Sequence, residues 1–105
     1  MNKIMNNNII NNGENNIKKL AIRFTTTLGT HRNIIMNFGE TIGQALIKYL
    51  IEANKPDLIN RNDKVSFLFN ATKINFDDET KIEDYFKNVH DPKILVNDTE
   101  GLRGG

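Results

Sequence analysis

Apolar residues alternate with polar or small residues from position 19 of this 105-residue chain. In the first run the apolar positions are Leu20, Ile22 and Phe24. A second run repeats the pattern at Ile34, Met36 and Phe38. A period of two over this length predicts half-buried β-strands. The polar stretch 25–30 between the runs contains a glycine, so the two strands are predicted to form a β-hairpin.

The pattern then changes to a helical one. The apolar positions at helical spacing are Ile42, Ala45, Leu46, Tyr49, Leu50 and Ala53. Thr41 and Gln44 have the spacing of a capping box, which predicts the start of the helix. Pro56 disfavours helical geometry at Lys55, so the helix is predicted to end near that residue.

The rest of the chain returns to short strands. After a polar connection over 57–64, a strand is predicted whose inward residues are Val65, Phe67 and Phe69. A turn over 70–73 and a short return strand over 74–76 follow. Capping-box spacing at Thr80 and Glu83 predicts a short helical turn, and 93–96 is the predicted final strand. This order predicts an α+β fold, a mixed sheet packed on one main helix.

Both ends differ in composition from this central part. Residues 1–17 are rich in asparagine and poor in core-forming side chains, which predicts a disordered extension removable without loss of stability. A recognition tail is the alternative, but low complexity alone does not support it. Residues 97–105 have no periodicity and are predicted to be a flexible tail, leaving 18–96 as the folded domain.

Composition and charge limit the classes of function. A chain of 12.0 kDa suffices for one modest core, and 38% hydrophobic residues fit a globular domain. A net charge of +1 gives no case for binding nucleic acid or membrane. No apolar run reaches the roughly 20 residues of a membrane span, and no signal peptide is recognisable. The absence of cysteine excludes disulfides and suits a reducing compartment.

No catalytic constellation is present in the sequence. His31 and His90 are predicted to lie in separate loops, with no cysteine to pair with. The acidic run 77–79 is better explained as a solvated loop than as a metal site. Neither phosphate-binding glycine motif occurs. We therefore expect no enzymatic activity, no cofactor and no metal.

The chain ends with the sequence Leu102-Arg103-Gly104-Gly105. Two glycines without Cβ atoms can pass through a channel too narrow for other residues and present the terminal carboxylate to a nucleophile. An ordinary frayed end is the alternative, because chain ends are commonly disordered.

This terminus, together with the predicted order of elements, resembles ubiquitin and its modifier relatives over residues 18–105. Shorter stretches agree in the same order. These are Glu40-Thr41-Ile42 at the start of the helix, residues 67–74 in the third strand and turn, which are also similar to SUMO, and Ile82-Glu83-Asp84-Tyr85. The resemblance implies a β-grasp fold. Two departures indicate a divergent paralogue: Gly101 stands where the family has an arginine, and the tail is about two residues longer.

The resemblance also implies a function. Gly105, presented with Gly104, would be activated and joined to lysines of target proteins, while Glu100, Gly101, Leu102 and Arg103 would be read by the activating enzyme. Conjugating and deconjugating enzymes would be further partners, and Lys73 is a possible chain acceptor, although an ordinary solvated turn lysine is the better explanation. We expect a cytoplasmic or nuclear monomer. The alternatives are a non-covalent ubiquitin-like domain from a longer or polyubiquitin-like precursor, and a sulfur carrier with a C-terminal thiocarboxylate.

Strand alternation predicts a partner-binding patch on the sheet face opposite the helix. If Phe67 and Phe69 point into the core, Leu68 must point outward, and Leu95 must do the same in the last strand. The family layout brings Leu28, in the first turn, close to them. Three leucines on one face would form an interaction surface, and the family binds partners through such a patch.

Overall fold

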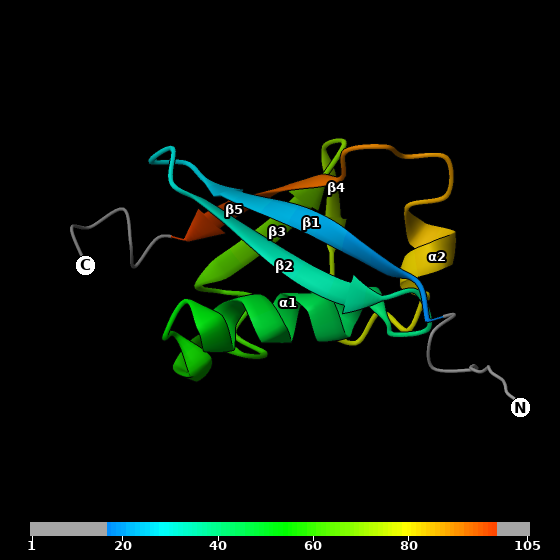
Figure 1. Ribbon diagram of the computed structural model, residues 1–105. Coiled ribbons are helices and arrows are strands. Elements are labelled where there is room, and N and C mark those ends of the chain that lie inside the picture. Colours follow the sequence, from blue (N-terminus) through cyan, green and yellow to red (C-terminus); the bar gives the residue numbers. More distant parts are fainter. Residues whose placement is uncertain (1–16, 99–105) are drawn as a thin grey trace, which may run out of the picture.

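The computed structural model describes residues 17–98, in which one five-stranded mixed sheet packs against one main helix (Figure 1). The elements in chain order are β1 (Lys19–Thr26), β2 (His31–Asn37), α1 (Ile42–Glu52), the 3₁₀ turn η2 (Pro56–Leu58), β3 (Val65–Phe69), β4 (Thr72–Ile74), α2 (Ile82–Tyr85) and β5 (Lys93–Asp98). The predicted α+β class, with a mixed sheet on one main helix, is confirmed.

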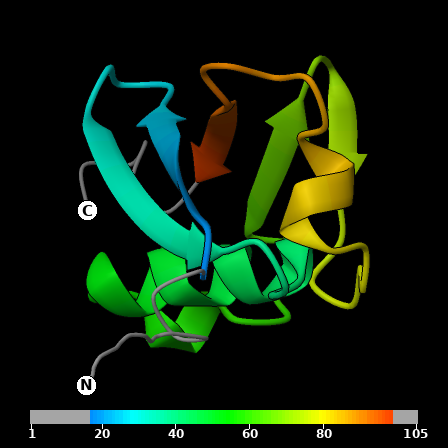
Figure 2. The same ribbon diagram turned by 45° about the vertical axis from the view of Figure 1, so that its right-hand side comes forward.

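The first and last strands of the described part lie side by side within the sheet. Its strand order is β2-β1-β5-β3-β4, with β1 and β5 parallel and the other neighbours antiparallel. Figures 1 and 2 both show α1 running across one face of this sheet. Within the described residues no helix covers the opposite face.

The core forms between the sheet and α1, where the predicted alternation places the apolar residues. The Phe24 ring stacks on the Tyr49 ring at a centroid distance of 4.6 Å, and Phe67 meets both rings edge-on. All three side chains are buried. Such offset and edge-to-face pairs are favoured by the ring quadrupoles. The strands and the helix are therefore held together by contacts between residues that are far apart in the sequence.

The start of α1 agrees with its prediction and shows an additional contact. The Thr41 hydroxyl accepts from the Gln44 amide, and the Gln44 side chain accepts from the Thr41 amide, so the capping box is formed. The next two amides, of Ile42 and Gly43, donate to the carbonyls of Thr80 and Asp78. The acidic segment 77–79 and the adjoining Thr80 thus each contribute one backbone carbonyl to the helix start.

The end of α1 differs from the prediction. The helix stops at Glu52, before the residues adjoining Pro56, because Asn54 takes a left-handed φ of 63° and reverses the chain. The connection to β3 is also more than a polar loop. It contains η2, and Leu58 there is buried in the core.

Two predictions about the β3–β4–α2 region are wrong in detail. The turn consists of Asn70 and Ala71, both with positive φ, so β4 begins at Thr72 and ends before Phe76. No capping box forms at Thr80; the N-cap of α2 is Lys81, without a side-chain bond. Carbonyls at positions 38 and 40 accept from the first amides of α2 instead, which leaves the hydroxyl no orphan donor to satisfy.

The boundaries of the strands near the chain ends need correction as well. β2 ends at Asn37, so Phe38 belongs to the following turn, where Glu40 accepts from the Asn37 amide. β5 continues past the predicted end at Val96 to Asp98, which is buried, so the folded domain includes two residues assigned to the tail. The predictions for residues 1–16 and 99–105 lie outside the described residues.

Helices able to cross a membrane would have to be both long and apolar, and none between residues 17 and 98 meets those conditions.

Candidate partner-binding face

The register of the sheet places five outward-facing residues in one row on the face opposite α1. Pairing connects His31 of β2 to Thr25 of β1, Thr25 to Leu95 of β5, Leu95 to Leu68 of β3, and Leu68 to Lys73 of β4. Residues paired across strands point to the same face. The row therefore has an apolar centre of two leucines and polar residues at both ends. We call it the outer row.

Leu68 and Leu95 are the two leucines that the structure brings together. Leu95 is 42% exposed, and Leu68, its direct cross-strand neighbour, is half-buried. An open hollow of about 700 Å³ lies over them. Its other lining residues are Arg23, Thr25, His31, Asn70, Ala71, Lys93 and Ile94. A hollow lined by apolar residues is suited to bind an apolar side chain.

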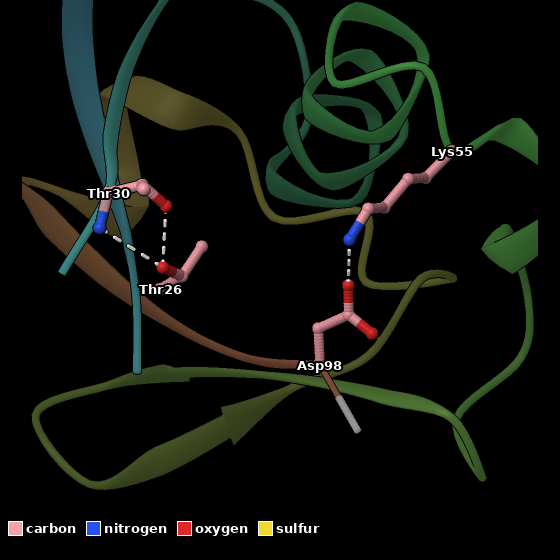
Figure 3. A network of polar contacts seen from close by, with 4 residues as sticks. All are labelled: Thr26, Thr30, Lys55 and Asp98. Atoms are coloured by element: carbon pink, nitrogen blue, oxygen red, sulfur yellow. Dashed lines mark hydrogen bonds and ion pairs between the residues drawn. The ribbon is translucent and has the colours of Figure 1, made fainter. Parts of the chain in front are cut away.

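Leu28 is placed apart from this hollow. It lies at the tip of the β1–β2 turn, is 66% exposed and is not among the residues that line the hollow. The turn itself is well defined: the Thr26 hydroxyl bonds with the Thr30 hydroxyl at 2.6 Å and accepts from the Thr30 amide at 3.2 Å (Figure 3). Gly29 takes a φ of 91°, which favours glycine. Leu28 is thus presented by a fixed turn, beside the outer row rather than in it.

Positive charge collects on the same face. Arg23 of β1 and Lys93 of β5 are cross-strand neighbours in the next row, and both line the hollow. Lys93 has a long ion pair with Asp91, at 3.6 Å, whereas Arg23 forms no ion pair within residues 17–98. At the outward positions of the five strands there is no carboxylate. A net charge of +1 for the whole chain hides this local excess.

Sequence reasoning missed the role of these two cations. Alternation in β1 and β5 already places Arg23 and Lys93 outward. Their proximity depends on the parallel pairing of the first and last strands, which no local pattern reveals. The local excess of charge makes the face attractive to an anionic partner surface and raises the rate of encounter with it.

The polar ends of the outer row are His31 and Lys73. His31 opens β2, not a loop as predicted, and its Nδ1 lies 3.0 Å from the Thr25 hydroxyl, so the ring is held at the edge of the hollow. Lys73 is exposed on β4, at the other edge of the sheet. His90 lies far along the chain in the exposed loop before β5 and lines no part of this hollow. Lys73 is accessible, and its role as a chain acceptor stays a prediction.

The residues of the predicted conjugation and tail-recognition site lie outside the described residues. These are Glu100, Gly101, Leu102, Arg103, Gly104 and Gly105. The structure does show the strand from which this segment continues. Asp98 ends β5, and its carboxylate pairs with the Lys55 ammonium across 43 residues of sequence.

Searches against protein-family models and against curated proteins found no match to this chain.

Proposed function

We propose that this chain is a ubiquitin-like protein modifier with a β-grasp fold, whose Gly105 carboxylate is activated and joined to lysines of target proteins. The observation that carries the proposal is the place of β5. The last strand is central in the sheet and parallel to β1. Seven residues follow it in the sequence, and the last four of these are Leu-Arg-Gly-Gly. A rigid domain followed by a narrow glycine end suits delivery of a carboxylate into an enzyme channel.

The chemistry has to be supplied by other proteins. A carboxylate is a poor acyl donor, so ATP first converts it to an acyl-adenylate with release of pyrophosphate. An enzyme thiolate then displaces AMP to form a thioester, in the manner of covalent catalysis. Attack by a lysine amine releases the thiol, loses a proton and leaves an isopeptide bond. Activating, conjugating and deconjugating enzymes would be the partners of this chain.

The outer row and its cations support a role in recognition by these enzymes. Leu68 and Leu95 offer an apolar contact, and Arg23 and Lys93 offer charges at its side. Neither position is required by the core, because both leucines face away from α1. We infer that this face docks protein partners while the tail delivers Gly105.

A direct test is to incubate the full chain with ATP and cell extract and to look for a shift in mass on a denaturing gel. The proposal expects a shift that needs ATP and is lost when Gly105 is deleted. A thiol-sensitive portion would be the enzyme thioester, and a thiol-resistant portion the isopeptide product. No ATP-dependent shift in an extract of the cells that produce this protein would contradict the proposal.

The same experiment separates the two alternatives. A non-covalent binding domain would retain partners through Leu68 and Leu95 without any ATP-dependent shift. A sulfur carrier would exchange one terminal carboxylate oxygen for sulfur, which intact mass measurement detects. Only the modifier forms a bond to a target lysine.

A further inference from the structure

One charged side chain is buried in the described part of the chain, that of Asp98. It is 7% exposed and points to the core side of β5, on the same side as Ile94 and Val96. Burying a carboxylate costs several kcal/mol unless a partner and hydrogen bonds compensate it. A sequence under no other constraint would be expected to place an apolar residue here.

Lys55 forms an ion pair with this carboxylate and reaches it from the segment after α1 (Figure 3). The Lys55 backbone is itself held in place. Its amide donates to the Leu50 carbonyl at 2.7 Å, Asn54 before it is left-handed, and Pro56 follows it. The Lys55 side chain is 39% exposed, so desolvation of its charge costs less than that of the buried carboxylate. The pair ties the end of the main helix to the end of the last strand.

The end of β5 needs such a tie more than the rest of the strand does. Its pairing with β1 ends at Val96, opposite Thr26. Its pairing with β3 continues to Asp98, opposite Val65. Asn97 and Asp98 therefore have a strand neighbour on one side only. A strand end with one neighbour frays easily, and the ion pair opposes this fraying.

Both charges of the pair act on the phenol of Tyr49, a buried residue of the core. Burial raises the pKa of the Tyr49 phenol. Lys55 lowers that pKa and Asp98 raises it, so both charges act on the phenol. An ion pair in a low-dielectric environment is stronger than one at the surface.

We propose that Lys55 and Asp98 are positioning residues, which clamp the end of β5 and so set the point from which residues 99–105 extend. This inference rests on the proposed function of Gly105. Seven residues span at most about 25 Å, so the reach of Gly105 depends on where the segment begins. An open clamp releases Asn97 and Asp98, and the activating enzyme must then order two more residues when it binds. The role differs from that of the outer row, which binds partners directly.

The test compares three variants of the full chain. Lys55→Met removes the charge and keeps the side-chain stem, so the buried carboxylate loses its ion pair with Lys55. Lys55→Met/Asp98→Leu replaces the pair with apolar side chains, which is often neutral or stabilising. Lys48→Met is the control, because it removes the same charge from a lysine whose ammonium donates to the Ile35 carbonyl of β2, a strand that does not pair with β5.

The first readout is amide hydrogen exchange over residues 94–98, measured by NMR. Exchange at 97–98 is expected to rise in Lys55→Met, to return to the unaltered level in the double variant, and not to change in Lys48→Met. The second readout is thioester formation with the enzyme fraction that charges the unaltered chain. For Lys55→Met we expect a KM raised by at least about tenfold, because two further residues must be ordered, with restoration in the double variant.

Several results would overturn the inference. Unchanged exchange in Lys55→Met would show that the pair does not hold the strand end. Raised exchange with normal charging would show that the strand end does not govern delivery of Gly105. A double variant that holds the strand but charges poorly would mean that the charges themselves contact the enzyme. If the unaltered chain is never charged, the proposed function fails, while exchange still decides whether the clamp exists.

Discussion

At the scale of single residues, Gly43 is required by a close approach of backbone. A Cβ at this position would lie 2.3 Å from the Phe76 carbonyl oxygen and 2.9 Å from that of Asp78. These oxygens belong to the segment that accepts from the first amides of α1, so they cannot move without loss of those bonds. The glycine lets the acidic segment and the helix start touch.

We expect Gly43→Ala to destabilise the fold by about 1–3 kcal/mol, the usual cost of overpacking. Helix propensity alone predicts the opposite sign, a gain of about 1 kcal/mol. Gly39→Ala is the matched control, since its Cβ would meet nothing within 4 Å. Urea unfolding of both variants decides the matter. A Gly43→Ala protein as stable as the unaltered one would mean that the segment 76–78 yields at little cost.

The β3–β4 turn contains a second residue whose identity conflicts with its conformation. Ala71 has a φ of 66°, in the left-handed region that costs an ordinary residue about 1 kcal/mol or more. Asparagine followed by glycine is the preferred pair in such two-residue hairpin turns. Ala71→Gly is therefore expected to stabilise the protein by about 0.5–1 kcal/mol, even though glycine has more entropy to lose.

Thermal unfolding measures this change. Ala21→Gly, at an exposed position of β1 with ordinary φ, is the control and should lower stability by about 0.5–1 kcal/mol. Equal effects of the two substitutions would show that the left-handed conformation at position 71 carries no strain.

At the scale of elements, local patterns predicted those parts of the structure that depend on neighbours in sequence. Alternation placed Ile22, Phe24 and Val96 in the core, and the capping box at Thr41 marked the helix start. The same spacing failed at Thr80, because carbonyls from a distant turn already satisfy the amides of α2. The end of β5 was missed because Asp98 has a polar side chain, and its ion pair with Lys55 joins residues 43 positions apart.

The candidate site was predictable to the same extent. Alternation alone puts Leu68 and Leu95 on the outer face, but their direct pairing depends on the register of β3 with β5. The cations beside them depend on the parallel pairing of β1 with β5. The register between strands depends on how all the core residues pack together, so it cannot be predicted from any single short stretch of sequence.

The two faces of the sheet should respond differently to truncation. We expect Leu68→Ala/Leu95→Ala to cost on the order of 1 kcal/mol, because Leu95 is 42% exposed and Leu68 is half-buried. Phe67→Ala, the control from the core face of the same strand, should cost about 3–5 kcal/mol. The double variant should fold normally yet form less thioester with the activating fraction. Loss of folding in the double variant would make the two leucines core residues.

At the scale of the whole molecule, the proposed function divides recognition between the folded domain and its tail. The domain offers an apolar row with cations beside it, and the tail offers Gly105 with the residues before it. An activating enzyme can then distinguish modifiers with similar domains by the sequences of their tails. In the family that this chain resembles, the arginine at the position of Gly101 helps an activating enzyme to tell one modifier from another.

We therefore predict that the ubiquitin-activating enzyme charges this chain poorly and that a dedicated or more permissive enzyme serves it. An arginine at position 101 would offer five donors to an acidic pocket through paired hydrogen bonds. Gly101 offers none, and the neighbouring Glu100 brings a charge of the wrong sign, which repels enzyme carboxylates. The missing hydrogen bonds and the repulsion both lower charging by the ubiquitin-activating enzyme.

Thioester formation by purified ubiquitin-activating enzyme tests this prediction, with ubiquitin as the reference substrate. Gly101→Arg combined with Glu100→Leu should increase charging by at least tenfold, since a charge-assisted pair contributes about 1.5–3 kcal/mol. Gly101→Ala is the control: it adds a side chain without donors and should leave charging low. Efficient charging of the unaltered chain by this enzyme would contradict the prediction. It would mean that Leu102, Arg103 and the two glycines suffice for recognition, and that the domain face separates the modifiers instead.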